Sequence, residues 1–195
     1  KVYAVNDSRF SGEGLTAVVR AFDLTAAEIF NQSYEIELPP ARAKPLVGLA
    51  DLTPPTPVWF LDLRLHDGGG DEVARNFYWL STTPDVLDYE NNLWFVTPTR
   101  EFADFTALGD LPDVELEVSA SENGSEVTVQ LDNITDALAF FVELKVVDAE
   151  GVSILPVLWE DNYVSILPGE SRELTARFPG ADDVSGARLE LKGWN

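Results

Sequence analysis

The chain contains no cysteine and no methionine, and it has a single histidine among 195 residues. The absence of cysteine excludes a disulfide framework, a thiolate nucleophile and a cysteine-ligated zinc site. His66 has no second histidine with which to hold a metal ion, so we assign it a structural or solvent-exposed position. No apolar run approaches the ~18 residues that span a membrane, and we therefore expect no membrane partner.

Basic residues are also scarce, with 13 lysines and arginines against 34 aspartates and glutamates. The resulting formal charge of -21 repels phosphate backbones and anionic lipid surfaces. Nucleic acid is therefore excluded as a partner. We interpret the charge as the solvated acidic surface of a secreted or salt-tolerant protein.

Long helical periodicity is missing, and apolar residues instead alternate with polar ones, which is typical of strands with one buried face. The alternating segments are 15–24, 28–38, 58–67, 73–82, 114–122, 126–133, 139–148, 162–168, 171–178 and 187–194. Turns rich in glycine, asparagine and aspartate separate many of these segments. A helical turn is predicted only within residues 99–112, where phenylalanine and leucine recur at threefold spacing before a glycine and a proline.

A weak internal repeat divides the chain into two halves. In each half a strand ends at an asparagine, Asn6 or Asn133, and the chain later reaches a proline corner, LPP at 38–40 or LPG at 167–169. Short strands joined by corners rather than crossovers are typical of immunoglobulin-like sandwiches. We therefore predict an all-β fold of two tandem immunoglobulin-like β-sandwiches.

The predicted domains are residues 1–98, which end in an aromatic linker, and residues 99–195. The opening KVYAVN behaves like the second strand of a sandwich, so we expect the first domain to lack its opening strand. Because the sequence opens inside a strand-like run and stops at LKGWN without a tail, we expect the chain to be a fragment of a longer protein.

Three carboxylates, Asp85, Asp88 and Glu90, are the best sequence candidates for acid–base chemistry because aromatic residues flank them. Glycoside hydrolysis needs two carboxylates ~5 to 9.5 Å apart, one of them held protonated in an apolar pocket. In so acidic a chain such clusters arise by chance, and we assign the three to a solvated loop. DGGGDE at 67–72 and GADD at 180–183 lack the spacing of a calcium loop, and we assign both to turns. We predict no catalytic, cofactor-binding or metal-ligating residue.

The strongest remaining signal is the aromatic stretch NFYWLSTTPDVLDYENNLWF at residues 76–95. In the segment 58–67 one alternate set is apolar and the other includes Asp62 and Arg64, so we expect a wet face from Asp62 onward. In the strand that contains Trp79 both alternate sets are apolar. A sandwich core covers one face only, so the second face needs another domain, a returning loop or a bound sugar.

Three blocks of sequence, residues 74–112, residues 155–178 and the closing LKGWN, resemble the C-terminal region of the exo-β-D-glucosaminidases of glycoside hydrolase family 2. The NFYWL element within the first block is shared with the β-mannosidases and endo-β-mannosidases of the same family. The resemblance implies a parent enzyme that carries its catalytic residues on a (β/α)8 barrel and ends in immunoglobulin-like domains, to which this chain corresponds.

The resemblance also implies that the parent enzyme hydrolyses terminal β-linked glucosamine in chitosan oligosaccharides, or β-mannosides, with retention. The catalytic pair of the barrel has no counterpart in this sequence. We therefore expect the barrel of the same polypeptide as the partner, and contact with polysaccharide or oligosaccharide substrate through the parent enzyme. We expect no cofactor, and a secreted or periplasmic location in a bacterium.

Three functions remain open. They are a structural tail that braces the barrel, a carbohydrate-binding module that stacks sugar on Trp79, Trp94 or Trp159, and an adhesion segment unrelated to glycosidases. We favour the first and interpret the aromatic stretch as a domain seam, in which the strand 77–80 closes the first sandwich and is covered on both faces. The predicted seam residues are Phe77, Tyr78, Trp79, Leu80, Tyr89, Trp94 and Phe95.

Overall fold

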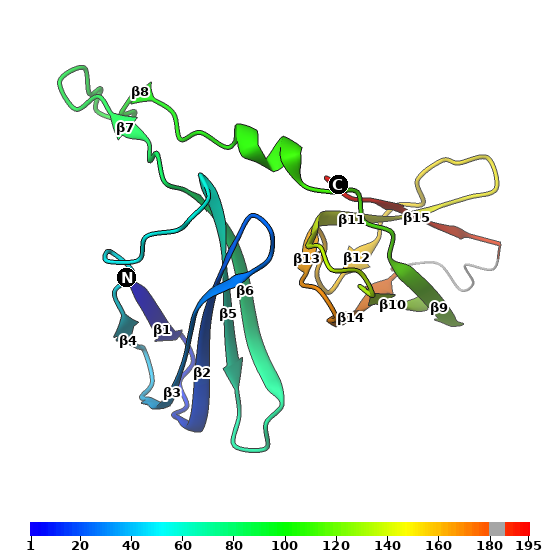
Figure 1. Cartoon of the computed structure of the whole chain (residues 1–195). Helices are drawn as coiled ribbons and strands as arrows, with labels where there is room; N and C mark the ends of the chain where they lie inside the picture. The colour runs from blue at the N-terminus through cyan, green and yellow to red at the C-terminus, as the bar shows by residue number, and fades with distance from the viewer. Residues whose placement is uncertain (180–185) are drawn as a thin grey trace. The chain divides into compact units, whose positions relative to one another are not determined.

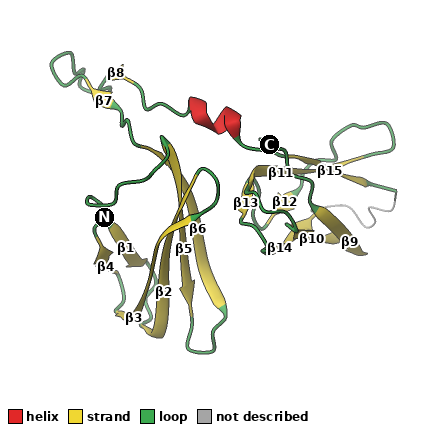
Figure 2. Cartoon of the chain, viewed as in Figure 1, coloured by secondary structure: helices red, strands yellow, loops and turns green. Residues whose placement is uncertain are grey.

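The computed structural model describes residues 1–179 and 186–195 of the chain. These residues form two compact units, Lys1–Gly109 and Asp110–Asn195, and each is described by itself. Both units are built from antiparallel strands, and the one helix among the described residues is a single 3-10 turn, η1 (Thr106–Asp110) (Figures 1 and 2). The predicted all-β class is therefore confirmed, and the helical turn lies within the predicted segment.

The division between the units follows Gly109, whereas the sequence pattern places it after residue 98. The difference has a simple cause in strand pairing. Strand β8 (Thr99–Glu101) pairs with β7 (Val86–Leu87), so this stretch folds back onto the first unit. Strands of two and three residues are too short to produce an alternation that sequence analysis could detect.

Besides the β7–β8 pair, the described residues of unit 1 form two sheets that share a core. The larger sheet has the order β3 (Glu28–Leu38), β2 (Gly12–Asp23), β5 (Val58–His66) and β6 (Glu72–Ser81), and the smaller one pairs β1 (Val2–Asn6) with β4 (Arg42–Val47). Val2 of the small sheet packs with Val19, Ala21 and Leu61 of the large sheet. The sequence pattern does not predict β4, because its two basic residues and Pro45 conceal the alternation.

Unit 2 is a second sandwich with its own core. One sheet has the order β12 (Leu158–Trp159), β14 (Ser171–Arg177), β10 (Glu126–Asp132) and β9 (Glu117–Asn123), and the other has β13 (Val164–Ile166), β11 (Ala139–Val147) and β15 (Arg188–Lys192). Alternate residues of β10 are buried, and they pack with Leu144 and Ile166 of the second sheet. This strict alternation is the pattern expected of a strand with one face in the core.

The internal repeat seen in the sequence has a structural counterpart in two asparagines. The Asn6 side-chain amide donates to the carbonyl oxygens of Phe10 at 2.8 Å and Leu38 at 2.9 Å. In unit 2 the Asn133 amide likewise donates to a carbonyl four residues ahead, at 2.8 Å, and to that of Ile166 at 2.9 Å. Each asparagine thus ties the end of one strand to a distant strand end beside a proline corner.

Candidate functional site

The aromatic strand β6 presents apolar side chains to both faces of its sheet. Its pairing with β5 places Tyr78 opposite Leu61, a core residue, so Tyr78 lies on the inner face of the sandwich. Trp79 is opposite Phe60, and both lie on the outer face. Successive residues of a strand point to opposite faces, so the alternation in NFYWL distributes its rings as the sequence predicts.

The outer face of the large sheet is apolar around Phe60, whose side chain is fully buried. The ring of Phe60 stacks on that of Phe77, with centroids 5.7 Å apart and an interplanar angle of 26°. Trp79 is 37% exposed beside them. This part of the face therefore carries a buried ring, a half-buried ring and a partly exposed indole side by side.

Asp62, on the same face, is fully buried, and the prediction of a wet face from this residue onward is wrong. Its carboxylate accepts hydrogen bonds from Arg20 at 2.6 Å, Arg64 at 2.8 Å and Arg75 at 3.0 Å. A buried carboxylate is tolerated only where charged hydrogen-bond donors replace water, and three guanidinium groups do so here. The signal that sequence analysis missed was the matching alternate position of the three arginines on adjacent strands.

The inner face of the large sheet is only partly covered by the small sheet. Tyr78 is 46% exposed, and Leu80 is half-buried. Together with Leu61, Leu63 and the start of β1 they line an open groove of about 510 Å³. Among the described residues the strand 77–80 is therefore not covered on both faces, and full coverage remains a prediction for a longer polypeptide.

Residues 86–101 form a hairpin arm that extends beyond the sheets of unit 1 (Figure 1). The backbone N–H of Asp88 donates to Pro98 at 2.8 Å, and that of Leu93 donates to Val96 at 2.8 Å. The Asn91 side chain also donates to the Asp88 carboxylate at 2.7 Å. Hydrogen bonds, rather than buried side chains, therefore connect the two halves of the arm.

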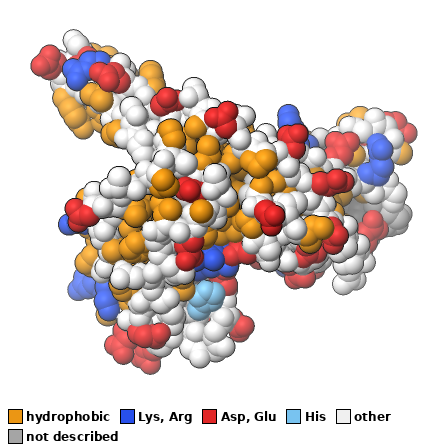
Figure 3. All heavy atoms as spheres, in the orientation of Figure 1, with side chains coloured by type: hydrophobic (Ala, Val, Ile, Leu, Met, Phe, Trp, Pro, Cys, Tyr) orange, Lys and Arg blue, Asp and Glu red, His pale blue; other side chains and the backbone are white. Residues whose placement is uncertain are grey.

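The tip of this arm exposes large rings to solvent. Trp94 is 94% exposed, Tyr89 is 71% exposed and Phe95 is 66% exposed. Trp94 and Phe95 contact each other edge to face, with centroids 4.8 Å apart. Figure 3 shows hydrophobic and charged side chains together at the end of the arm, at the upper left.

Two of the three candidate carboxylates, Asp85 and Asp88, accept hydrogen bonds from nearby residues of the chain. Asp85 accepts a hydrogen bond from the backbone of Ala103 at 2.8 Å. The hydrogen bond from Asn91 lowers the pKa of Asp88, opposed by a small burial effect. A glycosidase acid needs a raised pKa in an apolar pocket, so the lowered pKa of Asp88 opposes the role of general acid for this residue.

The remaining polar candidates are also placed in turns. The Asp67 carboxylate accepts hydrogen bonds from the backbones of Gly69 at 2.8 Å and Asp71 at 3.1 Å, which closes the DGGGDE turn. His66 lies 3.3 Å from the Gly70 carbonyl. The GADD segment lies outside the described residues. Within residues 1–179 and 186–195, no cluster of three or more acidic or histidine side chains is placed to hold a metal ion, and no helix is long and apolar enough to cross a membrane.

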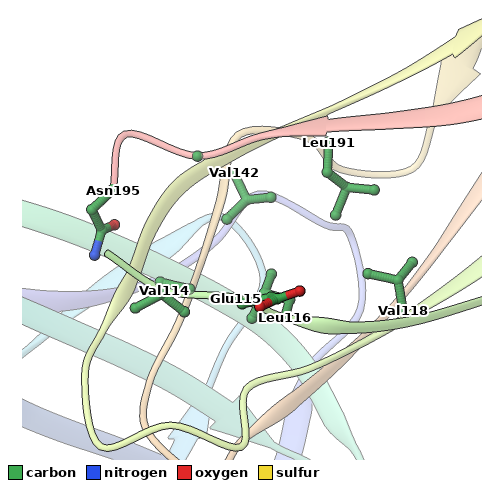
Figure 4. Close-up of a pocket in the computed structure, with 9 residues that line it drawn as sticks. Val114, Glu115, Leu116, Val118, Val142, Leu191 and Asn195 are labelled. Carbon is green, nitrogen blue, oxygen red and sulfur yellow. The ribbon is translucent and has the colours of Figure 1, made fainter. Parts of the chain in front are cut away.

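Unit 2 has a shallow groove of about 230 Å³ between its two sheets (Figure 4). Val114, Leu116, Val142 and Leu191 supply apolar side chains around it. Asn195 also lines the groove, and its side chain already makes hydrogen bonds within the unit. It accepts one from the Phe140 backbone N–H and donates to the Pro112 and Leu138 carbonyls, at 2.7 to 2.9 Å. Glu115 also lines the groove, as the one acidic side chain among its described lining residues, so the groove offers hydrophobic contact without a pair of acidic groups.

Trp159, the third candidate for sugar stacking, is half-buried against the hydrophobic core of unit 2. Trp94 is thus the most exposed of the three candidate platforms. An exposed indole can stack on a sugar or pack into an apolar pocket of another domain. The exposure of Trp94 is compatible with both roles.

Comparison with known proteins gives a consistent set of relatives. Residues 94–195 match the family model described as the exo-beta-D-glucosaminidase Ig-fold domain. The whole chain aligns with the exo-beta-D-glucosaminidases of Streptomyces avermitilis, at 34% identity over 23% of that protein, and of the fungus Arthroderma benhamiae, at 33% identity over 22%. The crystal structure of the Amycolatopsis orientalis exo-chitosanase CsxA matches 99% of the chain at 31% identity with a TM-score of 0.87, and the match spans 24% of that structure. The chain therefore spans less than a quarter of the length of these relatives.

Proposed function

The chain belongs to the family of exo-β-D-glucosaminidase Ig-fold domains, and from this premise we propose that it is the noncatalytic C-terminal accessory part of a family 2 glycosidase. The parent enzyme hydrolyses terminal β-linked glucosamine in chitosan oligosaccharides, with β-mannosides as the alternative substrate class. The observation that carries the proposal is alignment of the whole chain with less than a quarter of each relative.

The noncatalytic role is supported by the state of the carboxyl groups. Four carboxyl groups, those of Asp88, Asp104, Asp132 and Glu143, have a lowered pKa. The causes are hydrogen bonds from neighbouring side chains, such as Tyr163 on Glu143 and Ser171 on Asp132. A retaining glycosidase needs one carboxyl group with a raised pKa about 5 Å from a second one, so the reaction is assigned to the (β/α)8 barrel of the same polypeptide.

The accessory role is assigned to the aromatic surfaces of unit 1. We propose that both faces of β6 and the arm tip pack against other parts of the parent. The domain seam then consists of Phe77 and Trp79 on the outer face, Tyr78 and Leu80 on the inner face, and Tyr89, Trp94 and Phe95 on the arm. Trp94 is 94% exposed and its ring contacts the neighbouring Phe95, so the ring buries little surface within the chain. Burial of an indole of ~150 to 250 Å² at ~25 cal/mol per Å² contributes about 4 to 6 kcal/mol at a docked interface.

The proposal is tested with the purified chain and its parent enzyme. The chain alone is expected to show no hydrolysis of p-nitrophenyl β-D-glucosaminide or β-mannoside, and removal of the chain from the parent should lower the melting temperature of the barrel. Turnover by the chain alone would refute the noncatalytic role. Unchanged stability of the barrel after removal would refute the bracing role.

The exposure of Trp94 specifically favours one second function, a carbohydrate-binding module. Under that function soluble chitosan or mannan retards the chain in an affinity gel, and Trp94→Ala abolishes the retardation. We place the parent outside the cytoplasm, in the secreted or periplasmic fraction of a bacterium, on the basis of the strongly acidic surface; fractionation of the native host tests this placement.

A further inference from the structure

The two outer edges of the small sheet in unit 1 are built differently. Strand β4 carries Arg42, Lys44 and Pro45, the kinds of residue that protect an exposed strand edge from pairing. Strand β1 reads VYAVN and contains neither a charged residue nor a proline. Within the described residues β1 pairs with β4 alone, so its second edge presents unprotected backbone groups.

The internal repeat indicates what such an edge accommodates. Aligning Asn6 with Asn133 places Val2 and Ala4 of β1 at the positions of Val129 and Leu131 of β10, and in both strands these residues face inward. On one side β1 pairs with β4 as β10 pairs with β14, antiparallel in both units.

The other side of the two strands differs. In unit 2 that side of β10 is occupied by β9, whose Val118 lies opposite Leu131 and whose Ala120 lies opposite Val129. The equivalent position beside β1 holds no strand among the described residues of unit 1. Unit 2 therefore provides a template for a strand at the open edge of β1.

The surface next to this edge is shaped for apolar side chains. The groove of about 510 Å³ between the edge of β1 and strand β6 is lined by Val2, Leu61, Leu63, Tyr78 and Leu80. A side chain opposite Val2, on a strand that pairs with β1, would enter this groove. A side chain opposite Ala4 would enter the neighbouring groove of about 270 Å³, which Ala4 and Tyr78 both line. The same strand would cover Tyr78, which is 46% exposed.

We propose that the edge of β1 binds an extended segment of the longer polypeptide, outside residues 1–195, as an antiparallel strand with apolar residues opposite Val2 and Ala4. The inference rests on the proposed function to the extent that it requires a longer chain. Two observations favour this occupant over a second copy. Each copy carries a charge of -21, so two copies repel each other, and a segment of the same polypeptide acts at an effective concentration of about 1 mM or more.

The absence of cysteine makes the test direct, because a single introduced thiol can be followed without background. Tyr78→Cys reports on the groove, and Val73→Cys, at a position 52% exposed on the same strand, is the matched control. Thiol labelling is measured in the full-length polypeptide and in the 195-residue chain. Hydrogen exchange of the amides of residues 2–6 is measured in the unmodified proteins as a second readout.

In the full-length polypeptide the thiol at position 78 should react about tenfold or more slowly than in the shorter chain, with the control unchanged and the amides of β1 more protected. Equal labelling rates overturn the proposal. Protection of position 78 without protection of the β1 amides also overturns it, because a domain then covers the groove without strand pairing. Protection that rises with concentration in the shorter chain assigns the edge to a second copy. A full-length polypeptide without glycosidase activity would refute the proposed function and leave the strand result intact.

Discussion

Replacement of Asn133 by alanine is predicted to destabilise unit 2 far more than the equivalent change at Asn6 destabilises unit 1. Asn133 is 1% exposed, and its amide donates to the Ile166 carbonyl in the core and to the partly buried Ala137 carbonyl. A buried carbonyl left without a donor costs about 1 to 3 kcal/mol, and a lost partly buried hydrogen bond costs about 0.5 to 1.5 kcal/mol. We therefore expect Asn133→Ala to lower the free energy of unfolding of unit 2 by about 3 kcal/mol.

Asn6→Ala is the matched control, because Asn6 makes equivalent bonds at partly buried or exposed sites where water can replace the amide. We expect a loss of about 1 kcal/mol in unit 1. A chain of two units does not unfold as one two-state system, so hydrogen exchange resolved by unit is the suitable assay. Equal effects of the two substitutions, or a larger effect of Asn6→Ala, would refute the reasoning from burial.

Three further predictions concern charge and exposure. Asp62→Asn should destabilise unit 1 by about 3 to 5 kcal/mol in hydrogen exchange resolved by unit, because three arginines bond the buried carboxylate. Glu126→Gln removes an exposed ion pair and should change the stability of unit 2 by less than ~1 kcal/mol, and equal effects of the two substitutions would contradict this reasoning. The hydrogen bond from Ser171 lowers the pKa of Asp132, so its stabilisation is present above the ordinary value of 3.8 and lost as pH falls below it. Ser171→Ala should raise that pKa in an NMR titration, and an unchanged titration would contradict the assignment. Trp94→Ala should leave the melting temperature of the isolated chain unchanged, because the ring is 94% exposed there, and should lower the melting temperature of the parent. A lower melting temperature of the isolated chain would contradict this prediction.

Alternation was sufficient to predict the longer strands and the two-sided apolar character of β6. It succeeded there because Tyr78 and Trp79 are large residues in a strand of ten, long enough to define both faces. It failed at β4, where Pro45 and two basic residues mark a protected edge and conceal the strand. The arm was predicted as a linker because its paired segments contain only two and three residues.

The burial of the charged residue Asp62 could not be predicted from the sequence. Asp62 was expected in water because it shares an alternate set with Arg64, and charged side chains are rarely buried. Its burial depends on Arg20, Arg64 and Arg75, and two of these lie 42 and 13 residues away in sequence. Such a cluster becomes visible only when strand register is known, since register decides which alternate residues share a face. The arm tip with Trp94 was predicted to be part of a domain seam. That prediction depends on whether another domain covers Trp94 in the full-length protein.

Oxidative footprinting of Trp94 and Tyr78 in the full-length enzyme, with and without chitosan oligosaccharides, tests the central claim most directly. A domain seam predicts that both rings are protected in the enzyme without sugar, that they are reactive in the 195-residue chain, and that sugar changes neither. A Trp94 that reacts freely in the full-length enzyme and becomes protected only when sugar is added would contradict the account.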